Sequence, residues 1–281
     1  MQERIRGIVL RTVKYKESGL IVDLFTENHG RMSFMTNIGH GGSRKSAASA
    51  LWRPLNFVEF VADTHAQNRL ARPRDVVLYC HYADIPYNAT KSMMALFLAE
   101  FLSYTLRAQQ PDEPLYRFVE TSMSWLDAAP NAHIANFHLY FLIRLTRFVG
   151  IEPDTLSFAD FCHDSAIRKR AFMALAAPKV HAPLSTSLPL GGVGGGFSTL
   201  HASGLHTILQ PDEMRYLPLM LRISLANLHH YRFSRTQRHR VLEILEKYYR
   251  LHLPSFPELR SLDVLREVFE APLSSPQGGK K

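Results

Sequence analysis

Cysteine is scarce in this chain, with two residues among 281. Cys80 falls in an expected strand and Cys162 in an expected loop, so the sequence offers no disulfide framework. No apolar run approaches the roughly 18 residues that span a bilayer, and the longest candidate, residues 137–143, is interrupted by Arg144. The amino-terminal residues carry no secretory pattern, because their charges precede only a short apolar run. These absences predict a cytoplasmic protein with no membrane partner.

Catalytic signatures are missing as well. The sequence contains no Gly-x-Ser-x-Gly elbow, no His-Glu-x-x-His pair and no carboxylate cluster of the kind that holds two metals. The glycine-rich run at residues 191–196 lacks the Gly-Lys-Ser/Thr ending of a phosphate loop, and no clear strand precedes it. A Ser/His/Asp triad can be assembled from distant residues of almost any chain of this length, so composition does not exclude one. We expect a protein that is not an enzyme and needs no cofactor.

Short apolar runs separated by turn signals fill the first eighty residues. The runs lie at residues 8–15, 20–25, 31–38, 55–62 and 76–80. Their alternation and the turns between them predict a β-meander continued by two further strands. Five strands in about eighty residues predict a small closed barrel of the OB type, whose exposed face and loops commonly bind single-stranded nucleic acid.

Positive charge gathers in the same segment. Residues 1–80 contain twelve lysines and arginines and seven aspartates and glutamates, a net charge of +5, whereas the whole chain carries +8. A basic barrel attracts phosphate by releasing counterions, an effect that is independent of sequence and sensitive to salt. Fold and charge together therefore predict nucleic-acid binding, and we expect residues 1–82 to bind DNA on their own.

Helical periodicity replaces alternation after Pro86. Helices are expected at residues 90–107, 115–126, 133–149, 213–228, 235–250 and 259–269. Thr90 is the expected cap of the first, and Gly150 is expected just past the end of the third. These helices predict a bundle that is interrupted by an irregular insert.

The predicted fold class is α+β, an OB-type five-stranded barrel followed by an all-α bundle. The predicted domains are the barrel (1–82), the first part of the bundle (83–153), the irregular insert (154–209), the second part of the bundle (210–270) and a disordered tail (271–281).

Several of these stretches resemble the RecO family of bacterial recombination mediators, in particular its Bacteroidetes-type members. In the barrel they include Ile-Val-Leu-Arg-Thr at 8–12 and Ser-Gly-Leu-Ile-Val at 18–22, with shorter matches at 25–26 and 30–31. In the bundle the similar stretches are Pro-Tyr-Asn-Ala-Thr-Lys-Ser at 86–92, and residues 96–102, 248–252 and 259–265. The resemblance covers nearly the whole chain.

The resemblance implies a recombination mediator that binds single-stranded and double-stranded DNA and anneals complementary strands. It further implies that the protein, together with RecR, helps load RecA onto DNA coated by single-stranded DNA-binding protein (SSB). The implied partners are RecR and the carboxy-terminal tail of SSB, and the implied location is the cytoplasm, in association with the nucleoid. Family members hold that tail in an apolar pocket of the bundle. Phe137, Tyr140, Phe141 and Phe148 are candidates for such a pocket or, alternatively, for the bundle core.

Many relatives carry a four-cysteine zinc knuckle in the insert. Here Cys162 stands alone, with scattered histidines at His163, His181, His201 and His206. Because a closed structural site needs four ligands, usually in closely spaced pairs, we expect no bound metal.

Basic residues on the expected strands, on the loop after the third strand and in a second basic stretch at 229–240 are the candidate DNA contacts. They are Arg11, Lys14, Arg31, Arg44, Lys45, Arg53, Arg235 and Arg238. In the second stretch, arginines alternate with aromatic residues, a pattern that suits stacking on bases, but a solvated turn and helix face has the same composition.

Two other classes of function remain open from the sequence. An OB-type RNA-binding or protein-interaction module without annealing activity would explain the barrel but not the matches in the bundle. A hydrolase that uses the histidine-rich insert would need metal ligands that the spacing does not supply.

Overall fold

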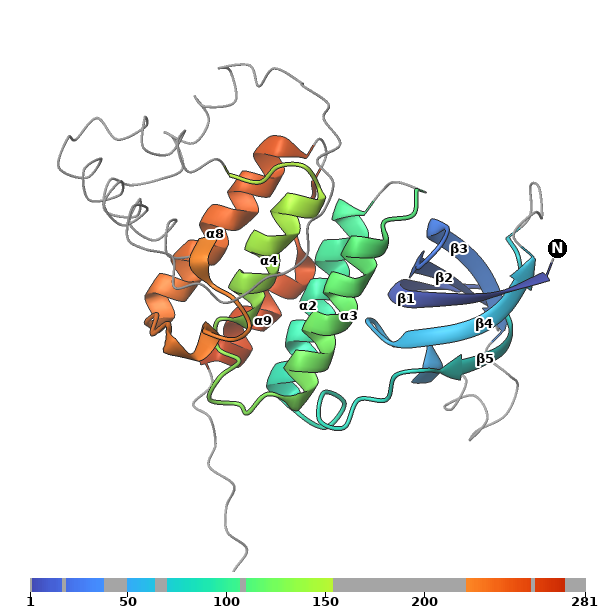
Figure 1. Ribbon diagram of the computed structural model, residues 1–281, viewed down its shortest axis with the longest axis horizontal. Helices are drawn as coiled ribbons and strands as arrows, with labels where there is room; N and C mark the ends of the chain where they lie inside the picture. The colour runs from blue at the N-terminus through green and yellow to red at the C-terminus, as the bar shows by residue number, and fades with distance from the viewer. Residues whose placement is uncertain are drawn as a thin grey trace, which may run out of the picture.

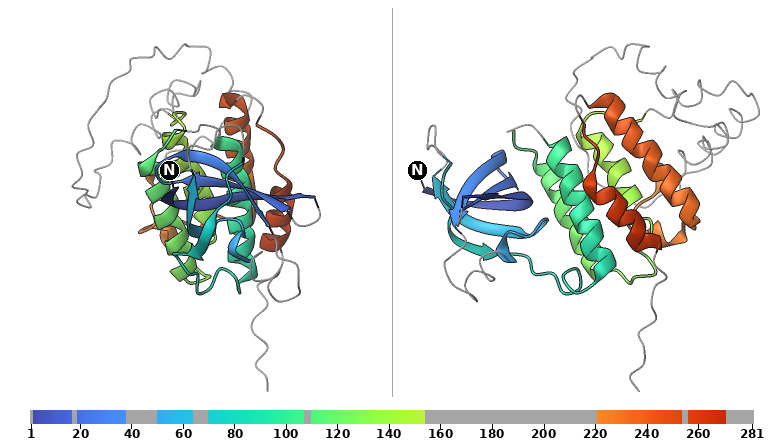
Figure 2. Two further views of the ribbon diagram at one scale, coloured as in Figure 1. Left: turned by 90° about the vertical axis from the view of Figure 1, so that its right-hand side faces the viewer. Right: turned by 180° about the vertical axis from the view of Figure 1, so that it is seen from behind.

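The computed structural model describes residues 2–16, 19–37, 50–63, 70–106, 110–153, 221–253 and 256–270. A five-stranded sheet lies at one end of the molecule, and helices fill the other end (Figures 1 and 2). The helices α2 and α3 lie next to the sheet, and α4 and α8 lie on the side of that pair away from the sheet (Figure 1). No helix in this part of the chain is long and apolar enough to cross a membrane.

The strands confirm the predicted OB-type arrangement. They are β1 (Gln2–Tyr15), β2 (Gly19–Thr26), β3 (Gly30–Asn37), β4 (Phe57–Asp63) and β5 (Arg74–Leu78). All neighbours are antiparallel, in the order β3-β2-β1-β4-β5. The prediction of a closed barrel is wrong, because β3 and β5 do not pair as neighbouring strands. Among the described residues, a backbone hydrogen bond of 3.0 Å from the Met35 amide to the Ala71 carbonyl links β3 to the residues before β5. The barrel is therefore partly open, a form that OB folds commonly take.

The first helices begin at polar caps. Asn88 caps α2 (Ala89–Thr105), and its side chain accepts a hydrogen bond from the Lys91 amide. The expectation that Thr90 is the cap is wrong, because Thr90 already lies inside the helix. Asp112 caps α3 (Glu113–Ala128) in the same way, by accepting from the Leu115 amide.

The next helix, α4 (Phe137–Phe148), is shorter than the predicted 133–149, because residues 131–133 form a turn. It ends in a Schellman motif. The amide of Ile151 donates to the carbonyl of Thr146, and the amide of Gly150 donates to that of Arg147. Gly150 has a φ of 74°, which confirms its predicted place just past the helix end.

The second part of the bundle contains η3 (Leu228–His230), α8 (Arg235–His252) and α9 (Arg260–Glu270). A reciprocal capping box between Ser234 and Gln237 begins α8. The helix predicted at 213–228 is wrong at its end, because the described helical residues stop at Arg222 and a turn follows. The insert at 154–209 and the tail at 271–281 lie outside the described residues.

The described residues form two hydrophobic cores, and the barrel contributes to both. Side chains such as Val9, Val22 and Phe60 fill the inside of the barrel. Barrel residues on the opposite face belong instead to the core of the bundle: Ile8, Leu10, Phe25, Leu55 and Phe57. Since β1 alternates between the two cores along its length, the barrel and the bundle share a continuous apolar interface.

Polar contacts lock the same junction. The hydroxyls of Tyr79 and Tyr116 lie 2.8 Å apart, and Arg117 on α3 pairs with Glu27 at 2.6 Å. The carboxylate of Asp127 accepts hydrogen bonds of 2.8–2.9 Å from three successive amides at residues 83–85, which connect the barrel to α2. The connection between the two parts is therefore fixed by specific partners.

Candidate nucleic-acid interface

Asp23 on β2 organises the cations at the barrel surface that faces α2. Its carboxylate accepts from Arg11 on β1 at 2.9 Å, from Arg31 on β3 at 3.0 Å and from the Ser33 hydroxyl at 2.6 Å. Burial acts to raise the pKa of Asp23, but the hydrogen bonds from Ser33, Arg31 and Arg11 outweigh it, so the pKa lies below its usual range. The charged carboxylate holds both guanidinium groups in place.

The two arginines differ in what else they contact. Arg31 also donates to the backbone carbonyls of Ser103 at 2.5 Å and Leu106 at 2.9 Å, at the end of α2. Its side chain is 18% exposed, whereas that of Arg11 is 51% exposed. Arg31 thus joins the barrel to the bundle, and Arg11 keeps half of its surface open to a ligand.

Arg11 opens onto a cavity of about 800 Å³ between the barrel and the bundle, which we call the barrel–bundle groove. The lining residues from the barrel are Leu10, Arg11, Thr12, Leu20, Trp52, Arg53 and Pro54. Those from α2 and α9 are Leu96, Ala99, Glu100, Ser103, Tyr104, Arg260, Ser261 and Val264. The groove thus combines surfaces that lie more than two hundred residues apart in the sequence.

The charge of the groove is positive. Arg53 and Arg260 are exposed and form no ion pair with the described residues. The single lining carboxylate, Glu100, is occupied: it accepts from the amides of Arg260 and Ser261 and from the Ser261 hydroxyl, and so caps α9. Three guanidinium groups with no free carboxylate suit a phosphate backbone.

The groove also presents apolar and aromatic surface. Leu96 and Val264 are 41% and 40% exposed, and the half-buried Tyr104 lines the wall. Trp52 also borders the groove, but it is only 4% exposed and belongs to the barrel core. Aromatic side chains between cations are the usual platform for unpaired bases. Sequence reasoning missed Trp52, Tyr104 and Arg260, because nothing in the local pattern shows that they meet.

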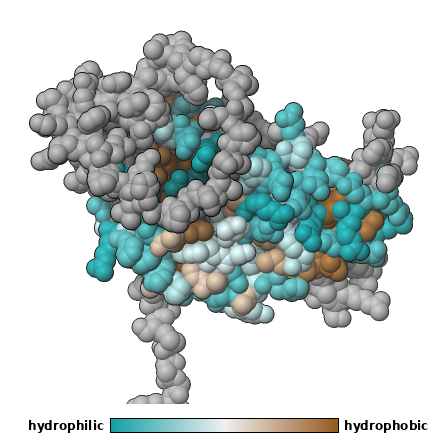
Figure 3. Space-filling model, viewed as in Figure 1, coloured by the Kyte–Doolittle hydropathy of each residue, from teal (hydrophilic) through white to brown (hydrophobic). Residues whose placement is uncertain are grey.

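Lys14 lies farther along β1, exposed beside the exposed side chains of Val13 and Tyr15. It forms no ion pair with any described residue and can extend the basic surface beyond the groove. Figure 3 shows that the face seen in Figure 1 is largely hydrophilic over the barrel, with separate apolar patches. Arg44 and Lys45 lie outside the described residues.

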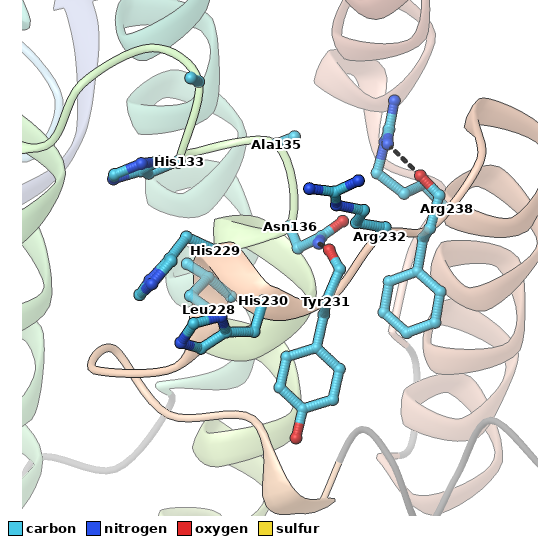
Figure 4. A pocket seen from close by; sticks show the side chains of 11 residues that line it. His133, Ala135, Asn136, Leu228, His229, His230, Tyr231, Arg232 and Arg238 are labelled. Carbon is cyan, nitrogen blue, oxygen red and sulfur yellow. Dashed lines mark hydrogen bonds between the residues drawn. The ribbon is translucent and has the colours of Figure 1, made fainter.

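Arg235 and Arg238 lie in the first turn of α8, on the side of the bundle away from the barrel (Figure 1). Arg235 is exposed, and Arg238 donates to the Phe233 carbonyl at 2.6 Å. Arg238 lines a second cavity, of about 710 Å³, which we call the histidine pocket (Figure 4). Its walls are Ala132, His133, Ala135, Asn136, Leu228, His229, His230, Tyr231, Arg232, Phe233 and Arg238. The candidate cations therefore form two separate groups.

The aromatic residues of α4 belong mainly to the core. Phe137 and Phe141 are fully buried, Tyr140 is 8% exposed, and Phe148 packs against the same core as a half-buried residue. The sequence left open whether these residues line a pocket for a partner's tail or form the bundle core, and their burial favours the core. Among the described residues no group of three or more side chains is arranged to hold a metal, and Cys162 with the histidines of the insert lies outside them.

Comparison with known proteins identifies the family. The model for the amino-terminal part of recombination protein O matches residues 1–79, and the model for its carboxy-terminal part matches residues 86–263. The chain is 35% identical over 270 residues to a DNA repair protein RecO of Phocaeicola vulgatus, covering 96% of this chain and 100% of the relative. It is 34% identical over 270 residues to that of Bacteroides fragilis, with the same coverage, and 33% identical over 267 residues to that of Porphyromonas gingivalis, covering 94% and 98%. The chain belongs to the RecO family of DNA repair and recombination proteins.

Proposed function

We propose that this chain is a DNA-binding mediator of recombinational repair that anneals complementary strands without hydrolysing a nucleotide. Membership of the RecO family supports the role in repair. The barrel–bundle groove carries the rest of the proposal, because three guanidinium groups surround a cavity whose wall includes Tyr104 and exposed apolar side chains. A single strand in this groove would place its phosphates on Arg11, Arg53 and Arg260 and its bases against Tyr104, Leu96 and Val264.

Annealing requires only that phosphate repulsion between two strands be reduced while the strands are held close together. Base pairing then supplies the driving force, so no catalytic group is needed. By resemblance to the family, we further propose that the protein acts with RecR, binds the acidic tail of SSB and helps load RecA in the cytoplasm. Lys14, Arg235, Arg238 and, on the loop outside the described residues, Arg44 and Lys45 remain proposed DNA contacts.

The test is a titration of the full chain with a fluorescent single-stranded oligonucleotide over a range of salt concentrations. The triple variant Arg11→Ala, Arg53→Ala, Arg260→Ala should bind more weakly, and its salt slope should fall by about 2 for three lost phosphate contacts. Arg4→Ala is the matched control, since Arg4 is an exposed arginine outside the groove that pairs with Glu59.

Annealing of complementary strands should proceed at the same rate with and without ATP, and it should slow in the triple variant. An unchanged salt slope in the triple variant would remove the groove from the proposal. ATP-dependent annealing would overturn the non-enzymatic mechanism. Tighter binding of RNA than of DNA, without annealing, would favour an RNA-binding module instead.

A further inference from the structure

The histidine pocket brings together three imidazoles from two separate segments. His133 comes from the turn before α4, and His229 and His230 belong to η3. The ring centroids of His229 and His230 lie 3.9 Å apart, and those of His133 and His229 lie 5.0 Å apart. In Figure 4 these imidazoles lie on one side of the pocket and the guanidinium of Arg232 lies on the other.

All charged or chargeable groups that face these imidazoles are basic or neutral in the described part of the chain. The turn before α4 supplies His133 and Asn136, η3 supplies His229 and His230, and the segment that follows supplies Tyr231, Arg232 and Arg238. Burial raises the pKa of Tyr231 while the positive charges of Arg222 and Arg144 act to lower it, and burial and then the positive charge of Arg235 lower the pKa of Arg238. No described carboxylate lines the pocket. A pocket of this composition repels cations and attracts an anion.

The three imidazoles are exposed at the pocket. The pKa of His229 is lowered by partial loss of hydration and then by the neighbouring His230 and His133. A bound anion would counter this effect, because a negative charge beside an imidazole favours its protonated form. Anion binding and proton uptake must therefore be coupled.

We propose that the histidine pocket binds the phosphate backbone of a second DNA strand, and that His229 takes up a proton when the strand binds. The inference rests on the proposed function, because a protein that anneals must hold two strands. The barrel–bundle groove would hold the first strand and the pocket the second, so that one molecule holds both strands. The start of α8, which lines the pocket, lies on the side of the bundle away from the barrel (Figure 1).

A nucleic acid fits this pocket better than an acidic peptide does. Phosphate oxygens accept hydrogen bonds from imidazole and guanidinium groups, as carboxylates also do. In addition, the ring faces of the histidines and Tyr231 offer stacking surface, which bases use and aspartate side chains do not. The ring of Phe233 is near parallel to that of Tyr231, with centroids 6.4 Å apart. Because Phe233 is only 9% exposed, it backs the Tyr231 ring and adds no stacking surface of its own.

The sign of the pH effect follows from the coupling. Since the protonated imidazole binds the anion better, binding of the second strand strengthens as the pH falls. Uptake of one proton increases affinity by up to about tenfold per pH unit, between the pKa of the free protein and that of the complex. Annealing by the full chain should thus be faster at about pH 6 than at about pH 8.

The test compares the full chain with the double variant His229→Gln, His230→Gln, in buffers that contain a chelator so that no metal bridges the imidazoles. The variant should keep the binding of a single oligonucleotide at the groove, which is intact, and lose the binding at the pocket. Its annealing rate should be low and independent of pH. His230→Lys, which fixes a positive charge, should anneal rapidly at both pH values. His81→Gln, at an exposed histidine outside the pocket, should behave as the wild type.

The outcomes separate the two proposals. If the wild type binds no DNA, or the groove variants have no effect, the proposed function fails. If the groove variants behave as expected but His229→Gln, His230→Gln leaves the annealing rate and its pH dependence unchanged, the pocket inference alone fails. A double variant that anneals normally but binds an aspartate-rich peptide more weakly would assign the pocket to a protein partner and overturn the proposal.

Discussion

Replacing Arg31 with alanine should lower the stability of the whole protein while leaving the salt dependence of DNA binding unchanged. The reason lies in its acceptors, which are the Asp23 carboxylate and the carbonyls of Ser103 and Leu106. All three belong to residues that are at most 8% exposed. Arg31 is therefore a structural bridge between the barrel and α2.

The size of the effect can be worked out from these partners. A buried carbonyl that loses its hydrogen-bond donor lowers the stability of the fold by about 1–3 kcal/mol. In Arg31→Ala, the carbonyls of Ser103 and Leu106 both lose a donor. Asp23 retains Arg11 and Ser33, so its loss is smaller. Water can enter the space that Arg31 leaves and satisfy part of the demand, so we expect a total loss of about 3 kcal/mol.

Urea denaturation of the full chain, followed by circular dichroism, measures this loss. Arg53→Ala is the matched control: Arg53 is exposed and forms no ion pair with the described residues, so its stability should change by less than about 0.5 kcal/mol. Its salt slope should fall by about 0.7–0.9, whereas that of Arg31→Ala should not change. Wild-type stability together with a flattened slope in Arg31→Ala would refute the reasoning and make Arg31 a phosphate contact.

Further predictions concern pH, the helix end, the domains and metal. The pKa of Asp23 is lowered in the folded protein, so the charged carboxylate stabilises the fold fully above its unfolded pKa of about 4, and this stabilisation is lost as the pH falls through the folded pKa. In Asp23→Asn, the free energy of unfolding should therefore fall less steeply with pH below about pH 4. Gly150→Ala should cost about 1 kcal/mol in urea denaturation, because φ is 74° and no clash adds to the strain. Residues 1–82 alone should bind a hydrophobic dye and unfold readily, because five core side chains lose their cover. Elemental analysis of the purified chain should find no stoichiometric zinc, because Cys162 has no partner cysteine in the insert.

The strands could be predicted from the sequence because their signals are local. The turns at 16–19 and 27–30 define the end of β1 and both ends of β2, and the start of β3, within a residue or two. The start of β1 was missed, because the strand begins at Gln2, six residues before the predicted run at 8–15. The cap of α2 was misplaced because Asn88 and Thr90 are both good cap residues, and only the backbone shows that the helix has begun before Thr90. Local chemistry thus decides which elements form, but not always where they begin.

The junction and the groove could not be predicted, because they depend on long-range contacts. Nothing near Arg31 indicates that its guanidinium meets carbonyls more than seventy residues away. Likewise, the local sequence does not show that Arg260 lines the same cavity as Arg11, because this depends on the packing of α9 on α2. For the same reason the expectation of an independent barrel overlooked the apolar face that Leu10 and Phe57 bury in the bundle.

The three amides that Asp127 fixes have a kinetic consequence for a groove built from two domains. Because the residues that connect the barrel to α2 are fixed and the two parts share a core, the barrel side and the bundle side of the groove are already in place when a strand binds. The ordering entropy of the domains is lost once, during folding, rather than at each encounter. Strand capture should then be a single bimolecular step at a rate set by electrostatic steering, with no slower phase of domain closure behind it.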